Sequence, residues 1–164
     1  MAVVVAIHGP SGSGKTTLIE QLIPRLRARW VSVGVIKHAH EGVVLDRRGK
    51  DSQRFWDAGV ETVLVASPQE VFVRERRSWS ALRELFDLLP QHLDCVLIEG
   101  FTHTIAAVDV PVSVTVEMTP DGVRLDGQLL CCNDIATTVE AAVMSRLRPN
   151  HVLTGSGGRS HERP

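Results

Sequence analysis

Hydrophobic residues form short continuous runs along this chain. The runs at residues 2–7 (AVVVAI) and 94–98 (DCVLI) are rich in β-branched residues and do not alternate with polar ones. This pattern is typical of strands buried on both faces of a parallel sheet. Further strands are predicted over residues 31–38 and 61–66, with a short one over 71–73.

Helical spacing appears between these runs. Leu18, Leu22 and Leu26 recur every four residues and predict a helix over residues 14–29. Strands that alternate with helices indicate an α/β fold with a mostly parallel sheet. Other helices are predicted over 50–58, ending at Gly59, over 80–89, ending at Pro90, and from the N-cap Asp134 to about Leu147.

The C-terminal third has a different pattern. Residues 111–117 alternate in strand fashion, and turn signals follow at residues 120–122 and 126–127. We therefore expect a small antiparallel β extension here. We also expect a single domain over residues 1–154 and a flexible tail over residues 155–164.

The segment from Gly9 to Thr16, GPSGSGKT, satisfies G-x-x-x-x-G-K-[ST] between a predicted strand and a predicted helix. Its glycines allow backbone N–H groups to turn inward around a phosphate, next to a helix N-terminus. Lys15 places a positive charge near the β and γ phosphates, and the Thr16 hydroxyl can ligate Mg²⁺. The sequence thus predicts a nucleoside triphosphate site, and the candidate binding residues are Gly9, Ser11, Gly12, Ser13, Gly14, Lys15 and Thr16.

Bound Mg²⁺ also needs a carboxylate. Glu99 follows the buried run 94–98 at the end where ligands of parallel sheets bind, whereas Asp94 lies at the opposite end and is discounted. Asp46, in the loop after the second strand, is the other candidate. A loop-capping role for Glu99 and a solvated position for Asp46 remain the alternatives.

Basic residues gather in two further places. The loop over residues 37–50 holds several groups that could contact phosphate, and its His38 and His40 would pair on a metal only with a third ligand. Substrate contact or simple exposure is the alternative for both histidines. Arg74, Arg76 and Arg77 form either a solvated face or a surface for an anionic ligand or partner.

Composition excludes several classes of protein. The net charge of −1, from 18 basic and 19 acidic residues, argues against a dedicated nucleic-acid binder. No apolar run approaches the roughly 18–20 residues of a membrane span, and the N-terminus does not resemble a signal peptide. The three cysteines fit neither a disulfide framework nor a zinc site, so we expect reduced thiols in a cytoplasmic protein.

Four segments taken together resemble one family: GPSGSGKTTLIEQLIPRL, VGVIKHAH, LDRRGKDSQRFWDAG and DCVLIEGF. They are similar to the MobB family, the molybdopterin-guanine dinucleotide biosynthesis adaptor proteins, over residues 3–104 and more weakly in the final helix. The resemblance implies a three-layer P-loop NTPase fold, a homodimer and GTP binding with weak or slow hydrolysis. It also implies that the protein assists the molybdenum cofactor guanylyltransferase, which attaches GMP to molybdopterin to make the dinucleotide form.

The resemblance also implies roles for individual residues. Residues 12–17, including Thr17, would hold the GTP phosphates, and Lys50, Asp51 and Ser52 would shape a switch-like loop. In related P-loop enzymes such as dethiobiotin synthetase, residues in matching positions share Mg²⁺. The candidate metal set is therefore Thr16, Asp46 and Glu99, and the candidate catalytic set is Lys15, Asp46 and Glu99.

Two other functions remain open. A small-molecule kinase or synthetase using ATP would place its acceptor against the loop over residues 37–50, but we find no long Arg-bearing insertion to close over it. A metallochaperone GTPase would need a richer Cys or His segment. The sequence has no clear guanine-reading N-K-x-D motif and no committed base to activate water, although Arg47 or Arg48 could act across a dimer. We therefore expect slow turnover.

Overall fold

The computed structural model describes residues 1–39, 50–101 and 110–147. These residues fall into two compact units. One contains residues 1–38 and the described residues from 81 onward, and the other contains the described residues of 39–80. The histidine at position 40 and the acidic and basic residues predicted at 46–48 lie outside the described residues, as does the predicted tail over 155–164.

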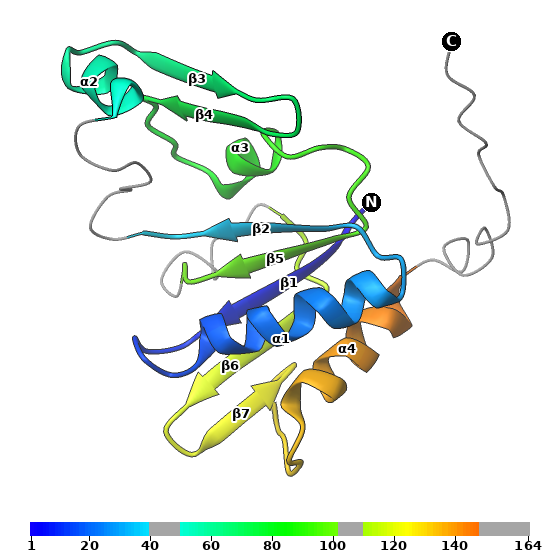
Figure 1. The fold of residues 1–164 in the computed structure, drawn as a ribbon. Coiled ribbons are helices and arrows are strands. Elements are labelled where there is room, and N and C mark those ends of the chain that lie inside the picture. The colour runs from blue at the N-terminus through cyan, green and yellow to red at the C-terminus, as the bar shows by residue number, and fades with distance from the viewer. Residues whose placement is uncertain (40–49, 102–109, 148–164) are drawn as a thin grey trace, which may run out of the picture. The chain divides into compact units, whose positions relative to one another are not determined.

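The first unit is built on a six-stranded sheet with the order β2-β5-β1-β6-β7-β8 (Figure 1). β1, β2, β5 and β6 run parallel, and β7 and β8 add an antiparallel edge. The mostly parallel α/β sheet with an antiparallel extension is therefore confirmed. The strand bounds are β1 Val3–His8, β2 Val33–Lys37, β5 Cys95–Glu99, β6 Val114–Thr119, β7 Gly122–Leu125 and β8 Gln128–Leu129.

Helices cover both faces of this sheet and complete three layers. α1 (Lys15–Ala28) and α4 (Ile135–Arg146) lie side by side on one face, where their leucines, valines and alanines bury one side of β1, β5 and β6 (Figure 1). Leu82 of the short α3 (Leu82–Phe86) belongs to a second buried cluster with Val4 and Val96. Successive β1 residues therefore face opposite clusters, which explains why its sequence shows no polar alternation.

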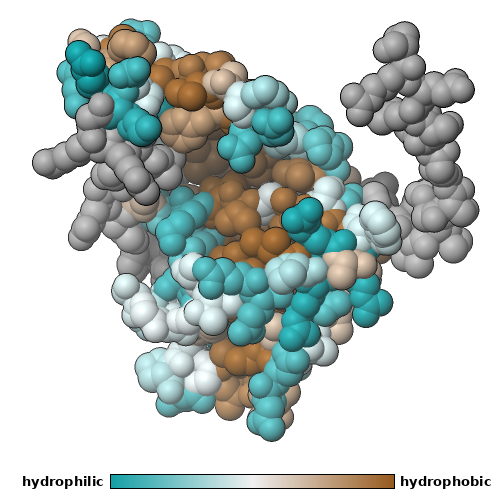
Figure 2. All heavy atoms as spheres, in the orientation of Figure 1, coloured by the Kyte–Doolittle hydropathy of each residue, from teal (hydrophilic) through white to brown (hydrophobic). Residues whose placement is uncertain are grey.

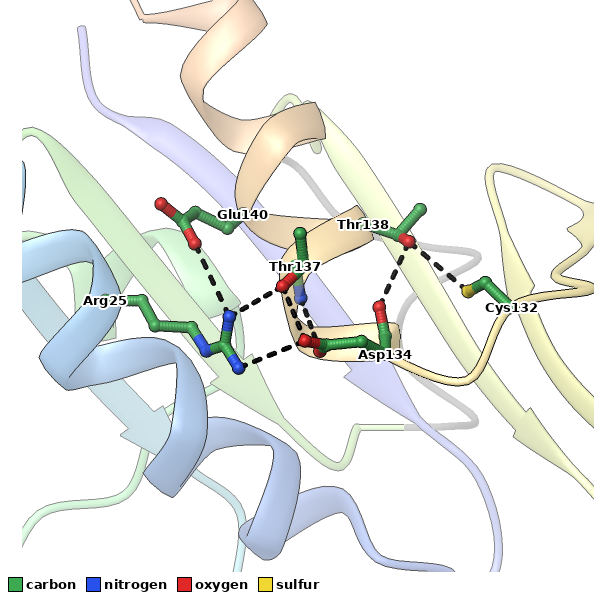
Figure 3. A network of polar contacts seen from close by, with 6 residues as sticks. All are labelled: Arg25, Cys132, Asp134, Thr137, Thr138 and Glu140. Carbon is green, nitrogen blue, oxygen red and sulfur yellow. Dashed lines mark hydrogen bonds and ion pairs between the residues drawn. The ribbon is translucent and has the colours of Figure 1, made fainter.

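A polar network joins α1 to α4 (Figure 3). Arg25 of α1 donates to the hydroxyl of Thr137 at 2.6 Å and to the carboxylate of Asp134 at 3.3 Å, and it pairs with Glu140 at 3.9 Å. Asp134 also accepts the backbone N–H of Thr137 at 2.9 Å, which confirms it as the N-cap of α4.

The second unit consists of α2 (Asp51–Asp57) and an antiparallel hairpin of β3 (Thr62–Ala66) and β4 (Val71–Glu75). The predicted strand at 61–66 therefore exists, but it pairs only with β4 among the described strands. Apolar side chains on this hairpin remain exposed and are visible as brown surface over it in Figure 2. In the described part of the chain, no helix is long and apolar enough to cross a membrane.

Candidate functional site

A tight loop connects β1 to α1 and contains three glycines with positive φ. The φ angles are 138° at Gly9, 75° at Gly12 and 91° at Gly14. Side chains strongly disfavour such angles, so glycine permits the sharp curl that brings the chain to Lys15, the first residue of α1. The first N–H groups of a helix have no partners within the helix, and they favour an anion there.

Gly9 is required by a close approach as well as by its φ angle. A Cβ atom at this position would lie 2.5 Å from the carbonyl oxygen of Met118 and 2.8 Å from its Cβ. Met118 belongs to β6, the strand paired in parallel with β1. The start of the loop is thus fixed against the end of a neighbouring strand.

Lys15 lies folded back over this loop. Its Nζ donates to the carbonyl oxygens of Gly9 at 3.0 Å and Pro10 at 2.6 Å. The ammonium charge is therefore held at the loop by two neutral acceptors rather than by a carboxylate. An anionic oxygen is a stronger partner for an ammonium group, so a phosphate could compete for it.

Two hydroxyls of the predicted binding set occupy different environments. Ser13 Oγ is buried and has no hydrogen-bond partner among the described residues. Buried polar atoms without partners are uncommon, and a phosphate oxygen is one acceptor that would satisfy this hydroxyl. Thr16, in the first turn of α1, donates from Oγ1 to Glu99 Oε1 at 3.1 Å. Ser11 and Thr17 are exposed.

Glu99 ends β5 and connects the loop to β2. It is only 8% exposed, and it is the one buried charged residue among those the structure describes. While Oε1 accepts from Thr16, Oε2 pairs with Lys37 Nζ of β2 at 3.0 Å. A buried carboxylate needs such partners, because desolvation would otherwise make its charge costly. The sequence predicts Lys37 only as one of several basic groups near phosphate, so its pairing with Glu99 is new here.

Asp94 stands at the other end of β5 and has a structural partner. Its Oδ2 accepts the backbone N–H of Ser32 at 2.8 Å and the Ser32 hydroxyl at 2.7 Å. These bonds tie the beginning of β5 to the residue before β2. The structure thus agrees with discounting Asp94 as a metal ligand.

The chemistry of the assembled donors fits Mg²⁺. A threonine hydroxyl and a carboxylate are oxygen ligands of the kind that Mg²⁺ prefers, and Thr16 and Glu99 lie in contact. Within the described ranges, no group of three or more His, Cys, Asp or Glu residues could hold a metal. Of the three predicted ligands, Thr16 and Glu99 are in contact, and Asp46 lies outside the described residues.

Comparison with known proteins identifies the family. The family model described as molybdopterin guanine dinucleotide synthesis protein B, MobB, matches residues 4–113. The chain belongs to the MobB family.

Curated relatives support this membership. The molybdopterin-guanine dinucleotide biosynthesis adapter protein of Haemophilus influenzae is 41% identical over 108 residues, which cover 60% of this chain and 56% of that protein. The adapter protein of Escherichia coli is 38% identical, covering 63% of this chain and 61% of its own length. The chain thus spans little more than half the length of these MobB relatives.

The fold matches solved MobB structures. Bacillus subtilis MobB superposes with a TM-score of 0.62 over 90% of this chain and 99% of that chain, at 24% sequence identity. This likeness confirms the P-loop NTPase fold predicted from the sequence.

Arg74 and Arg76, from the second basic cluster of this MobB member, pack against Trp56 of α2. Their guanidinium carbons lie 4.0 and 4.1 Å from the centre of its ring. Arg76 also donates to the carbonyl oxygens of Val60 and Trp56, and Arg74 donates to Gln53. These two arginines therefore fasten α2 to the hairpin, a role that the sequence pattern did not indicate.

Proposed function

We propose that this chain is a nucleotide-binding adaptor in molybdopterin guanine dinucleotide biosynthesis. The observation that carries the proposal is the contact between Thr16, at the end of the glycine loop, and the buried carboxylate of Glu99. It joins the predicted phosphate loop to the candidate metal ligand in a chain whose family is MobB. The names of the Haemophilus influenzae and Escherichia coli relatives supply the pathway.

In this proposal the nucleotide is GTP with Mg²⁺. The loop residues Gly9 and Ser11 to Thr17 surround the phosphates, and Lys15 leaves its carbonyl partners to contact them. Thr16, Asp46 and Glu99 hold the metal, whose charge offsets that of the phosphate oxygens. Lys37 holds the Glu99 carboxylate in place through their ion pair.

Hydrolysis in this site is proposed to be slow. Lys15 and the metal ligands Asp46 and Glu99 can stabilise charge on the phosphates, but phosphoryl transfer also needs a positioned water. Glu99 is a poor candidate base because this proposal assigns its carboxylate to the metal, and its two oxygens also contact Thr16 and Lys37. Faster hydrolysis would need a further residue supplied by another molecule, such as Arg47 or Arg48 of a second copy of the chain.

The proposed partners follow from the family. They are molybdopterin or its dinucleotide form, the molybdenum cofactor guanylyltransferase, and a second copy of the chain. We place the protein in the cytoplasm, and its three free cysteines are compatible with a reducing compartment.

The decisive experiment is a titration of GTP and of ATP, each with Mg²⁺ and with EDTA, by calorimetry. We expect GTP to bind more tightly than ATP, and Mg²⁺ to strengthen GTP binding. Lys15→Ala should weaken GTP binding at least about tenfold, because a charge-assisted contact of about 1.5–3 kcal/mol is lost. Arg27→Ala is the matched control, since it removes an exposed positive charge from the same helix.

A preference for ATP would instead support the small-molecule kinase or synthetase. Equal GTP affinity in the Lys15→Ala variant and the parent would contradict the assignment of the phosphate site.

A further inference from the structure

The backbone immediately after Glu99 makes an unusual turn. Gly100 has φ of 91° and Phe101 has φ of 60°, so two successive residues occupy the left-handed region. Glycine does so at little cost, but a bulky side chain is strained there. Strained residues persist only where their surroundings hold them, and they cluster at functional sites.

Hydrogen bonds to both neighbouring strands hold the backbone where this turn begins. The Glu99 carbonyl oxygen accepts the N–H of His38 at 3.0 Å, at the end of β2. The Gly100 N–H donates to the Ile7 carbonyl oxygen of β1 at 3.1 Å. The single peptide group between Glu99 and Gly100 is thereby tied to both adjacent strands, through its carbonyl oxygen to β2 and through its N–H to β1.

Burial offsets the strain at Phe101. Its side chain is only 2% exposed and belongs to the buried cluster that contains Val4 and Ile98. Its ring centre lies 4.7 Å from that of His38, with the planes tilted by 36°. A Cβ at Gly100 would lie 3.2 Å from His38 Cβ, so the end of β2 and this turn are in close contact.

We propose that Phe101 is a positioning residue for the metal-binding carboxylate. Its buried ring holds the strained turn against His38, and the turn fixes the backbone of Glu99. The two oxygens of Glu99 then face Thr16 and Lys37 before any ligand arrives. The inference rests on the proposed function only in taking Glu99 as a ligand of the nucleotide-bound Mg²⁺.

The test uses Phe101→Leu in the full chain. This change keeps an apolar side chain, although a smaller one, and removes the ring contact with His38. The control is Leu82→Met, a conservative change at a fully buried residue of the same cluster. Phe101→Gly is the second variant, because it removes the ring and the backbone strain together.

Amide hydrogen exchange by NMR provides a readout that needs no nucleotide. We expect Phe101→Leu and Phe101→Gly to lower the protection of the His38 and Gly100 amides at least about tenfold, while the amide of Val5 in β1 keeps its protection. Leu82→Met should leave all three amides unchanged. A parallel loss at all three amides, or no loss at His38 and Gly100, would overturn the inference.

The second readout is the ratio of the GTP Kd in EDTA to that in Mg²⁺. We expect this ratio to fall about tenfold towards one in Phe101→Leu, with the Kd in EDTA changed less than twofold. An unchanged ratio despite lost amide protection would show that Phe101 does not position the carboxylate, and would refute the proposal. If the parent chain binds no nucleotide, the proposed function fails, and the exchange data still decide whether Phe101 fixes the turn.

Discussion

Cys95 differs from the other two cysteines in its surroundings. It is fully buried in β5, and burial, with a smaller contribution from the charge of Asp94, raises the pKa of its thiol to about 12. Cys131 and Cys132 are exposed. Because the thiolate is the reactive form, we predict that Ellman's reagent at about pH 8 titrates two thiols quickly and the third only after denaturation. In a Cys131→Ser, Cys132→Ser variant the native protein should be unreactive, and a third thiol reacting at the same rate would contradict this.

At the level of residues, the sequence could predict those candidate site residues whose positions follow from a motif or from the end of a strand. Thr16 and Lys15 follow from the loop pattern, and Glu99 follows from its place at the end of a buried strand. Lys37 could not be assigned to Glu99, because pairing two strand ends requires the strand order, which puts β2 beside β5. The sequence also could not predict the proposed positioning role of Phe101. That role depends on the positive φ angle of Phe101, and no sequence pattern predicts such an angle for a phenylalanine.

Among the elements, α4 begins at a carboxylate cap, Asp134. Hydrogen bonds from the Thr137 hydroxyl and backbone N–H, and to a lesser extent Arg25, hold the pKa of Asp134 below its usual 3.8. A lowered pKa in the folded state means that this carboxylate stabilises the fold above about pH 4, and that the stabilisation is lost as the pH falls through the lowered value.

We therefore predict that Asp134→Asn destabilises the protein at neutral pH and that the difference from the parent shrinks in acid. Asparagine retains the capping geometry, so the comparison isolates the charge. Urea unfolding at about pH 7 and about pH 3 measures both free energies of unfolding. Asp121→Asn, on an exposed turn residue, is the control. A difference that stays constant or grows as the pH falls would refute the prediction.

The elements also show what the hydrophobic pattern of the sequence cannot predict, namely strand pairing and the exact length of a helix. The strands at 2–7 and 94–98 were recognisable because burial on both faces leaves an uninterrupted apolar run. Residues 111–117 alternate as an extension strand would, yet β6, which overlaps this region over Val114–Thr119, pairs in parallel with β1 and antiparallel with β7. Alternation reports which face of a strand is buried, but not which neighbours it pairs with. The helix predicted over 80–89 is also shorter, covering Leu82–Phe86.

For the whole molecule, the location of the site follows from the strand directions. β1, β2 and β5 are parallel, so their C-terminal ends meet at one edge of the sheet, where Lys37, Glu99 and the glycine loop gather. This is the edge where open α/β sheets bind ligands. The hairpin could not be placed by that rule, because its two strands form a separate antiparallel sheet.

That hairpin has one face that its own unit leaves exposed. Leu64 pairs with Val73 and Ala66 pairs with Val71, and paired residues share a face. Leu64, Val71 and Val73 are 62%, 67% and 53% exposed. A two-stranded hairpin is marginally stable alone, and an exposed apolar face favours association. The proposed function includes a second copy of the chain, and we predict that this copy covers the face.

Leu64→Glu should then raise the dimer dissociation constant at least about 30-fold, the effect of losing a contact worth roughly 2 kcal/mol at the centre of an interface. Sedimentation equilibrium measures this constant directly. Gln69→Glu adds the same charge at the exposed turn between β3 and β4, and it should leave the dimer intact. Circular dichroism establishes that both variants remain folded. A Leu64→Glu protein that dimerises as tightly as the Gln69→Glu protein would place the contact between copies elsewhere on the chain, and a monomeric parent would remove the dimer altogether.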